Sequence, residues 1–225
     1  MKVCTDACLF GAWVADQSER QPFPPINILD IGAGTGLLSL MLAQKLPLAR
    51  IDAVEIEDNA ARQAAENAEA SPWSDRIQIL QGDIRTLHFG KQYDCILSNP
   101  PFYANDLKSP SAGRNLALHS EALDLPELFT AATKALSPNG KLALLLPAAR
   151  EGEALAIAAI HKLWPESICR IHQTPTHQPF RVILWLGKEK TSPTHQTILI
   201  REGPQYSPAF RTLLADYYED RAWRG

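Results

Sequence analysis

Short, almost continuously apolar segments alternate with helical patterns along most of this 225-residue chain. Apolar runs of strand length, without the alternation of a half-exposed strand, are typical of strands buried on both faces. Strands that are separated in sequence by helices predict a parallel sheet covered by helices on both sides. We therefore expect an α/β fold with a mostly parallel, twisted sheet of seven strands.

The expected elements follow one another from residue 26 onward. The seven strands are expected at residues 26–31, 51–55, 77–81, 93–98, 141–146, 168–173 and 180–187, with a short extra strand at 197–201. The helices are expected at residues 37–46, 58–69, 126–136, 151–163 and 210–218, and Asp58 or Asn59 is expected to cap the second of them. Open sheets of this kind bind ligands beyond the carboxyl ends of their strands, where the strand order reverses.

Length and composition fit one globular domain that spans residues 1–225. A hydrophobic fraction of 45% and a charged fraction of 21% are ordinary for such a domain, and no apolar run approaches the length of a membrane span. The first residues lack the apolar core of a signal peptide. The cysteines form no Cys-x-x-Cys pair; they are Cys4, Cys8, Cys95 and Cys169. We expect reduced cysteines, no metal, no membrane contact and a cytoplasmic location.

A glycine-rich loop joins the first expected strand to the first expected helix. It reads Asp30-Ile-Gly-Ala-Gly-Thr-Gly36, and its glycines allow a sharp turn and a close approach of the backbone to a ligand. Dinucleotide-binding loops have the spacing Gly-x-Gly-x-x-Gly, whereas here the spacing is Gly-x-Gly-x-Gly after an acid on the strand. The candidate cofactor-binding residues of this loop are Asp30, Gly32, Ala33, Gly34 and Gly36.

Acidic residues follow the next two expected strands and are candidates for the same ligand. Glu55 ends the second strand, where a carboxylate can accept from both hydroxyls of a ribose, and Glu57 competes for that role. Asp83 follows the third strand, where its carboxylate can accept from the exocyclic amine of the cofactor adenine, with Ile84 beside the ring. Alone, each acid also fits a solvated strand end or turn, but the features in register favour a nucleoside ligand.

The segment Asn99-Pro100-Pro101-Phe102 follows the fourth expected strand. Its two prolines end the strand and stiffen the turn, and Pro101 has no N–H to compete for the Pro100 carbonyl. An amide side chain, that carbonyl and an aromatic ring then lie within four residues. They offer two acceptors for the hydrogens of a planar amine and a face for its ring. Because Asn-Pro is also a common turn dipeptide, the upstream glycine loop is what favours a catalytic role.

Taken together, these motifs resemble those of the class I, Rossmann-like methyltransferases that modify planar amines of adenine, cytosine, guanine or glutamine. Further segments are similar to the bacterial tRNA adenine-N6 methyltransferases that act on adenine 37 of a valine tRNA. These segments are residues 1–13, 64–67, 71–77, 199–203 and 205–207. The resemblance covers nearly the whole chain.

The resemblance implies S-adenosylmethionine as the cofactor and methyl transfer to the N6 amine of an adenine in the anticodon loop of tRNA, by a monomer. The implied catalytic residues are Asn99, Pro100, Pro101 and Phe102, and Asn99 also belongs to the cofactor-binding set. Asn99 and Pro100 would accept the two N–H bonds of the amine, and Phe102 would stack on the base. Thr5 and Asp6 would lie against the methionine end of the cofactor.

Two features depart from the family's pattern. Family members usually carry more chain before the Met1 segment, so we expect a missing N-terminal extension. Phe102 stands where Tyr is common in adenine-N6 enzymes, and Phe is frequent in the rRNA guanine-N2 enzymes. A guanine-N2 or a protein glutamine-N5 methyltransferase therefore stays an alternative. A non-catalytic nucleotide-binding protein or a nicotinamide-dependent oxidoreductase is less favoured, the latter because of the glycine spacing.

Charge is distributed unevenly along the chain. Residues 1–140 carry 11 Lys and Arg against 17 Asp and Glu, and residues 141–225 carry 11 against 8, which favours a polyanion-facing side in the C-terminal third. The candidates for phosphate contacts are Lys108, Arg114, Arg150, Arg170, His172, His177, Arg181 and Lys188. The polar segment 103–120 is expected to form a lid over the site. His119 is not nominated as a general base, because the product cation loses its proton easily.

Overall fold

The computed structural model describes residues 4–101 and 123–219. Phe102, His119 and the expected lid at 103–120, which contains Lys108 and Arg114, lie outside the described residues. In chain order the elements are α1 (Thr5–Glu19), β1 (Asn27–Ile31), α2 (Leu37–Lys45), β2 (Arg50–Glu55), α3 (Asp58–Glu69), β3 (Ile77–Gln81), β4 (Tyr93–Ser98), α5 (Leu125–Ala135), β5 (Leu136–Pro147), α6 (Glu151–Ile160), β6 (Trp164–His172), β7 (Pro179–Gly187), β8 (Thr194–Leu199), β9 (Arg201–Glu202), β10 (Gln205–Tyr206) and α7 (Pro208–Leu214).

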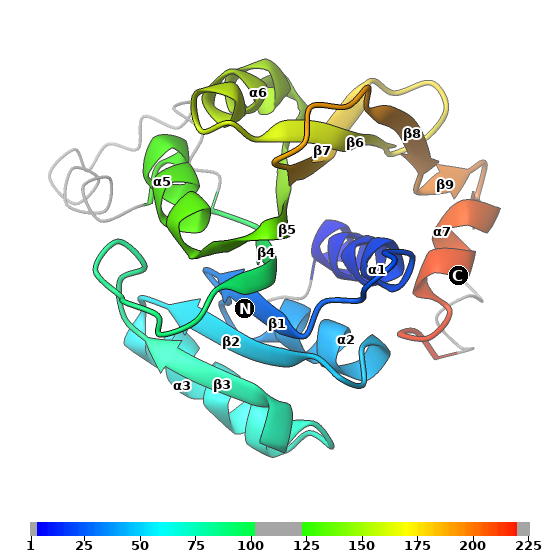
Figure 1. The fold of residues 1–225 in the computed structure, drawn as a ribbon. Coiled ribbons are helices and arrows are strands. Elements are labelled where there is room, and N and C mark those ends of the chain that lie inside the picture. The colour runs from blue at the N-terminus through cyan, green and yellow to red at the C-terminus, as the bar shows by residue number, and fades with distance from the viewer. Residues whose placement is uncertain (1–3, 102–122, 220–225) are drawn as a thin grey trace, which may run out of the picture.

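The centre of the fold is one sheet of eight strands in the order β3-β2-β1-β4-β5-β7-β6-β8 (Figure 1). Strands β3 to β5 run parallel, β7 is antiparallel to both of its neighbours, and β8 is parallel to β6. The expected mostly parallel sheet is confirmed, but the count of seven strands is wrong. The segment expected as a short extra strand begins at Thr194 and pairs with β6 over six residues, so that this mostly exposed edge strand satisfies backbone groups of β6 and of its own.

Helices cover both faces of the sheet, as the alternation of strands and helices predicts. α1, α2 and α7 lie on one side, and α5 and α6 lie together on the other (Figure 1). Successive residues of β1 point into different cores: Ile28 packs under α1 and α2, whereas Leu29 packs with residues of α5 and α6. The strand order reverses between β1 and β4, next to the chain turns that carry the candidate site residues.

Helix α1 is the largest element that the sequence analysis does not predict. All of its residues from Ala7 to Ala15 are buried, and it packs against α2, α7 and β5. A helix that is apolar on every side has no amphipathic period. The pattern of residues 5–19 therefore carries no helical signal, although the long apolar run itself is visible in the sequence.

The cap of α3 also differs from the expectation. The Glu57 carboxylate accepts from the backbone N–H groups of Asn59 (3.1 Å) and Ala60 (2.7 Å), and these bonds lower its pKa. The predicted caps, Asp58 and Asn59, are wrong, because the helix already begins at Asp58 and a capping side chain must precede the first turn. Glu57, the competitor of Glu55 for a ribose, thus serves as a helix cap.

Candidate active site

The strands β1 and β4 end at the same level of the sheet. Ile31 and Ser98 are register partners, and the buried Ser98 hydroxyl donates to the Ile31 carbonyl at 2.7 Å. The residues that follow, Gly32 and Asn99, therefore leave the sheet side by side at the point where the strand order reverses. This is the position at which open α/β sheets bind their ligands.

The glycine loop has a left-handed backbone at each of its three glycines. Gly32, Gly34 and Gly36 have φ values of +75°, +57° and +82°. Residues with a Cβ rarely adopt such values, because the Cβ approaches the following carbonyl oxygen. The N–H groups of Gly32 and Ala33 both bond to the Val54 carbonyl, at 2.9 and 3.0 Å, so the loop is fixed on β2.

The two sides of this loop differ in how much room they leave. A Cβ placed on Gly32 would meet no atom of the described residues within 4 Å, whereas a Cβ on Gly36 would lie 3.4 Å from the Cβ of Ala64 on α3. The Asn67 side chain, also on α3, donates to the Thr35 carbonyl at 2.9 Å. Gly32 therefore borders open space for a ligand, and Gly36 allows α3 to support the loop closely.

Glu55 joins the end of β2 to the glycine loop. It is 9% exposed; its Oε2 accepts from the Gly34 N–H (2.7 Å), and its Oε1 accepts from the Glu57 N–H (2.9 Å). A carboxylate oxygen has two lone pairs, so each oxygen keeps one acceptor position. Two free acceptor positions, one on each oxygen, suit the adjacent hydroxyls of a ribose.

Asp30 is fully buried below the loop. Its Oδ2 accepts from the Ser39 hydroxyl of α2 (2.8 Å), and its Oδ1 has no hydrogen-bond partner among the described residues. Burial away from water raises the pKa of this carboxyl from its ordinary value of 3.8 to about 7, and the nearby Glu55 charge adds to the effect. A buried polar atom without a partner is unusual, and here it lies at the base of the candidate cofactor site.

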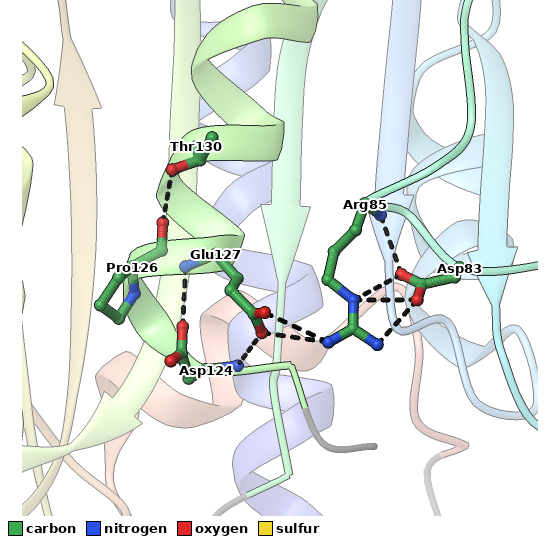
Figure 2. Close-up of polar contacts among 6 residues, drawn as sticks. All are labelled: Asp83, Arg85, Asp124, Pro126, Glu127 and Thr130. Atoms are coloured by element: carbon green, nitrogen blue, oxygen red, sulfur yellow. Dashed lines mark hydrogen bonds and ion pairs between the residues drawn. The ribbon is translucent and has the colours of Figure 1, made fainter. Parts of the chain in front are cut away.

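Asp83 and Ile84 follow β3, whose end is fixed to β2 by the bond from the Gly82 N–H to the Glu55 carbonyl (2.9 Å). Ile84 is 7% exposed and packs into the core under α5. The Asp83 carboxylate is held by Arg85, whose guanidinium also reaches Glu127 at the start of α5 (Figure 2). Arg85 lowers the pKa of Asp83 by these bonds, so the carboxylate is ionised and accepts hydrogen bonds.

The described residues of the turn after β4 differ in how far they are buried. Asn99 is half-buried, Pro100 is buried and Pro101 is exposed. The structure thus brings Asn99 next to the glycine loop, and Glu55, Asp83 and Ile84 lie at the same edge of the sheet. No described contact joins Thr5 or Asp6 to this group: Thr5 is exposed on α1, and Asp6 accepts from Arg181 at the start of β7 (2.9 Å).

The candidate phosphate contacts that lie among the described residues have protein partners. Arg150 pairs with Glu153 (2.8 Å) and Arg170 with Glu151, while Arg181 pairs with Asp6. The side chains of His172 and His177 are hydrogen-bonded within the turn between β6 and β7. Lys188 donates to the Leu136 carbonyl at the beginning of β5, which places it at the edge of the sheet opposite the glycine loop.

Residues that fix the site through other side chains were missed in the sequence. Arg85 and Asn67 are the clearest cases, because each bonds to a candidate site residue or to the glycine loop. Neither the position of Arg85 relative to Asp83 nor that of Asn67 relative to the glycine loop follows a helical or strand period, so no sequence pattern predicts these contacts. A basic residue two positions after a candidate carboxylate is the only local sign that the sequence offers for Arg85.

The acidic side chains and the open space at this edge of the sheet fit S-adenosylmethionine. Glu55 and the ionised Asp83 make the carboxyl edge acidic, which suits a ligand that carries a sulfonium and an ammonium group and disfavours the pyrophosphate of a dinucleotide. The open space at Gly32 and the free acceptor positions of Glu55 agree with a nucleoside in this place.

The described part of the chain contains no candidate metal site and no candidate membrane span. Residues 4–101 and 123–219 contain no group of three or more His, Cys, Asp or Glu side chains that could hold a metal ion. The same residues include no helix of the length and apolarity that a membrane span needs. None of the four cysteines forms a disulfide; Cys4 is exposed and the other three are buried.

Comparison with known proteins gives consistent matches. Residues 17–162 match the model of the methyltransferase small domain family. The chain is 41% identical, over 97% of its length and 90% of the relative's, to a tRNA1(Val) (adenine(37)-N6)-methyltransferase of Dyadobacter fermentans. Relatives of the same name in Flavobacterium psychrophilum and Tolumonas auensis are 39% and 38% identical, each over 97% of this chain and over 92% and 90% of the relative.

Solved structures show the same fold at lower identity. A predicted O-methyltransferase of Agrobacterium tumefaciens has a TM-score of 0.72 at 19% identity and covers 94% of this chain and 96% of its own. The glycopeptide N-methyltransferase MtfA, in complex with S-adenosylmethionine, has a TM-score of 0.58 at 12% identity, covering 80% of this chain and 94% of its own. These likenesses establish the Rossmann-like methyltransferase fold.

Proposed function

The chain belongs to the family of the tRNA1(Val) (adenine(37)-N6)-methyltransferases, with S-adenosylmethionine as the methyl donor, and from this premise we propose which RNA atom it methylates and which residues act. The substrate is the exocyclic N6 amine of adenine 37 in a valine tRNA. The observation that carries the proposal is the Asn99 turn at the switch point, directly beside the glycine loop.

In this proposal the turns after β1, β2 and β3 hold the methyl donor. One wall of the cofactor site is the backbone of the glycine loop, at Gly32, Ala33, Gly34 and Gly36. Asp30 lies beneath this loop and supports it. The remaining lone pairs of Glu55 accept from the ribose hydroxyls, and Asp83 accepts from the adenine amine with Ile84 beside the ring. Thr5 and Asp6 face the methionine end. When bound, S-adenosylmethionine supplies an electrophilic methyl group on its sulfonium.

The turn after β4 then prepares the nitrogen that is methylated. The amine lone pair of adenine is delocalised into the ring, so the free base is a poor nucleophile. The Asn99 side-chain oxygen and the Pro100 carbonyl accept hydrogen bonds from the two N–H groups of the amine. These bonds favour a pyramidal nitrogen and stabilise the positive charge that develops on it. Pro101 keeps the Pro100 carbonyl free of a competing donor. The product cation loses its proton to solvent, and no strong base is needed.

The base must leave its stack before its amine can reach this turn. Bases of an anticodon loop are already partly splayed, which lowers that cost. Phe102 is proposed to stack on the extruded adenine, a contact worth about 1–3 kcal/mol in other base–aromatic pairs. We further propose that the protein acts as a monomer in the cytoplasm, where its tRNA substrate is found, and without a metal ion.

Methyl transfer from labelled S-adenosylmethionine to unmodified bulk tRNA, followed by nucleoside analysis, tests the proposed function. We expect N6-methyladenosine, located in a valine tRNA. Label recovered only as methylguanosine would favour the rRNA guanine-N2 alternative, and label found only in protein would favour the glutamine-N5 alternative. Either result would overturn the proposal.

A further inference from the structure

Arg85 lies two residues after Asp83, the proposed acceptor for the adenine amine, and it contacts both oxygens of the Asp83 carboxylate. Its Nε lies 2.9 Å from Oδ1 and 2.8 Å from Oδ2, and its second guanidinium nitrogen lies 2.7 Å from Oδ2. The backbone N–H of Arg85 also donates to Oδ1 at 2.9 Å. The forked guanidinium matches the carboxylate in the two-point manner that makes such pairs strong and directional.

These bonds occupy most of the hydrogen-bond acceptor positions of the Asp83 carboxylate. An ionised carboxylate has about four acceptor positions. Three N–H donors of Arg85 bind it, one from the backbone and two from the guanidinium, and the single Nε hydrogen is shared between the two oxygens. The Asp83 side chain is 26% exposed, so it is open to one further donor. An exocyclic amine that donates one hydrogen fits the exposed side of this carboxylate, whereas a carbonyl oxygen in its place would face an acceptor.

The guanidinium of Arg85 is itself held from the opposite side. Its other terminal nitrogen lies 3.2 and 3.3 Å from the two oxygens of Glu127, on the first turn of α5 (Figure 2). Glu127 cannot turn away freely, because it forms a capping box with Asp124: its carboxylate accepts from the Asp124 N–H (3.2 Å), and its own N–H donates to Asp124 Oδ1 (2.8 Å).

The contact with Glu127 is needed because there is open space beside the Arg85 side chain. Arg85, Ile84 and Glu127 border a cavity of about 1010 Å³ between the segment 84–92 and α5. A guanidinium without the Glu127 contact could swing into that cavity and release Asp83. The Asp83 backbone is already fixed, because its carbonyl accepts from the N–H groups of Thr86 (3.0 Å) and Leu87 (3.1 Å). Side-chain orientation is therefore the remaining freedom that Arg85 removes.

We propose that Arg85 is a positioning residue that aims one acceptor position of Asp83 at the amine of the cofactor's purine and thereby sets the preference for adenine over hypoxanthine. The inference rests on the proposed function, because it needs the cofactor adenine beside Asp83. Arg85 touches neither the methyl group nor the target base. Its loss changes cofactor selectivity and leaves the Asn99 turn intact.

The test compares two ligands that differ only at the purine, S-adenosylhomocysteine and S-inosylhomocysteine, whose dissociation constants are measured by calorimetry on the full chain. We expect the wild-type protein to prefer the adenine ligand by at least about tenfold, the ratio that one hydrogen bond to a charged group supports. The Arg85→Gln variant should weaken adenine binding by about tenfold and leave inosine binding unchanged. Arg85→Lys, which keeps the charge but not the fork, should fall between the two.

Two controls separate positioning from folding. Arg62→Gln removes an exposed arginine that also pairs with an aspartate, Asp58, and should leave both affinities unchanged. Asp83→Asn should abolish the preference, and the double variant with Arg85→Gln should show no further loss if both residues act on one contact. Thermal melts of each variant check that it is folded; if Arg85→Gln is not, Arg85→Lys decides.

The outcomes distinguish this inference from the proposed function. If Arg85→Gln keeps the wild-type preference, or weakens both ligands equally, the positioning role is wrong, while the adenine site at Asp83 stands. If the wild-type protein binds the two ligands equally, the adenine contact of Asp83 is wrong and the inference falls with it. Methyl transfer to tRNA is measured separately and depends on neither result.

Discussion

The two halves of the sheet use polar side chains differently. In the half formed by β3, β2, β1 and β4, polar groups at strand ends bond to the backbone of neighbouring turns, as Ser98 does to the Ile31 carbonyl and Glu55 to the Gly34 N–H. In the half formed by β5, β7, β6 and β8, charged side chains pair mainly with one another, as Arg170 does with Glu151. Backbone bonds fix the position of a turn, whereas an ion pair between two side chains acts on the orientation of those side chains.

Under the proposed function, this difference suits the half that carries the glycine loop and the Asn99 turn to catalysis. A turn whose backbone is fixed presents its acceptors at constant positions, which a methyl transfer to a weak nucleophile requires. The comparison is sharpened by changing one residue in each half and measuring the same quantity.

The largest effect is expected at Asn99. Its replacement by alanine removes one of the two acceptors for the amine, and we expect the rate of methyl transfer to fall by at least about 100-fold. Affinity for S-adenosylmethionine should stay within a few-fold, because the glycine loop and Glu55 are unchanged. Single-turnover kinetics and calorimetry give the two values.

Asn139→Ala in the other half is the matched control, since Asn139 is exposed near the beginning of β5. It should leave both the transfer rate and the cofactor affinity at wild-type values. A wild-type transfer rate for Asn99→Ala would remove Asn99 from the mechanism.

A smaller effect, dependent on pH, is expected at Asp30. Its pKa is about 7 in the folded protein and 3.8 ordinarily, so the folded state binds the proton more tightly than the unfolded state. Ionisation of Asp30 therefore destabilises the fold. The penalty is absent below pH about 4, grows as the pH rises to about 7 and is constant above, reaching about 4 kcal/mol.

Asp30→Asn removes this penalty and keeps an oxygen for the Ser39 hydroxyl. The free energy of unfolding of the variant, minus that of the wild type, should rise between pH 4 and 7 in urea titrations. Ser167→Ala, which removes a buried hydroxyl without a described partner in β6, should shift stability equally at every pH. A flat difference for Asp30→Asn would show that Asp30 is ionised at no extra cost.

The smallest effects are expected from one substitution made at two glycines. Gly36→Ala forces a Cβ onto a residue with φ of +82° and should destabilise the protein by about 1–2 kcal/mol. Gly152→Ala lies on α6, where a Cβ meets nothing within 4 Å, and should stabilise by about 0.5 kcal/mol. Unfolding in urea measures both, and equal signs would contradict the strained geometry of the loop.

Much of the catalytic half could be predicted from the sequence, because its strands are short, apolar and followed at once by informative residues. The ends of β3 and β4 fall at the predicted residues, and the glycines lie in the turn where they were expected. The candidate residues Asn99, Glu55 and Asp83 were found because each lies at the end of a strand or within two residues after it. Their roles toward the cofactor and the base stay predictions.

The remainder was hidden for physical reasons. Helix α1 is buried on every side and has no amphipathic period. Only the second half of β8 was expected, because the first residues of this edge strand are polar and mostly exposed. Arg85 acts through the side chains of Asp83 and Glu127, and Glu127 is 42 residues away in sequence. Contacts between distant side chains have no local pattern to read.

Methyl transfer to two valine tRNA transcripts that differ only at position 37 tests the central claim most directly. One transcript carries adenine at position 37 and the other guanine, and the rate of label transfer from S-adenosylmethionine is measured on both with the same protein. We predict rapid transfer to the adenine transcript, with N6-methyladenosine as the product, and no transfer to the guanine transcript above background. Equal transfer to both transcripts, or transfer to the guanine transcript alone, would contradict the assignment of the Asn99 turn to the amine of adenine 37.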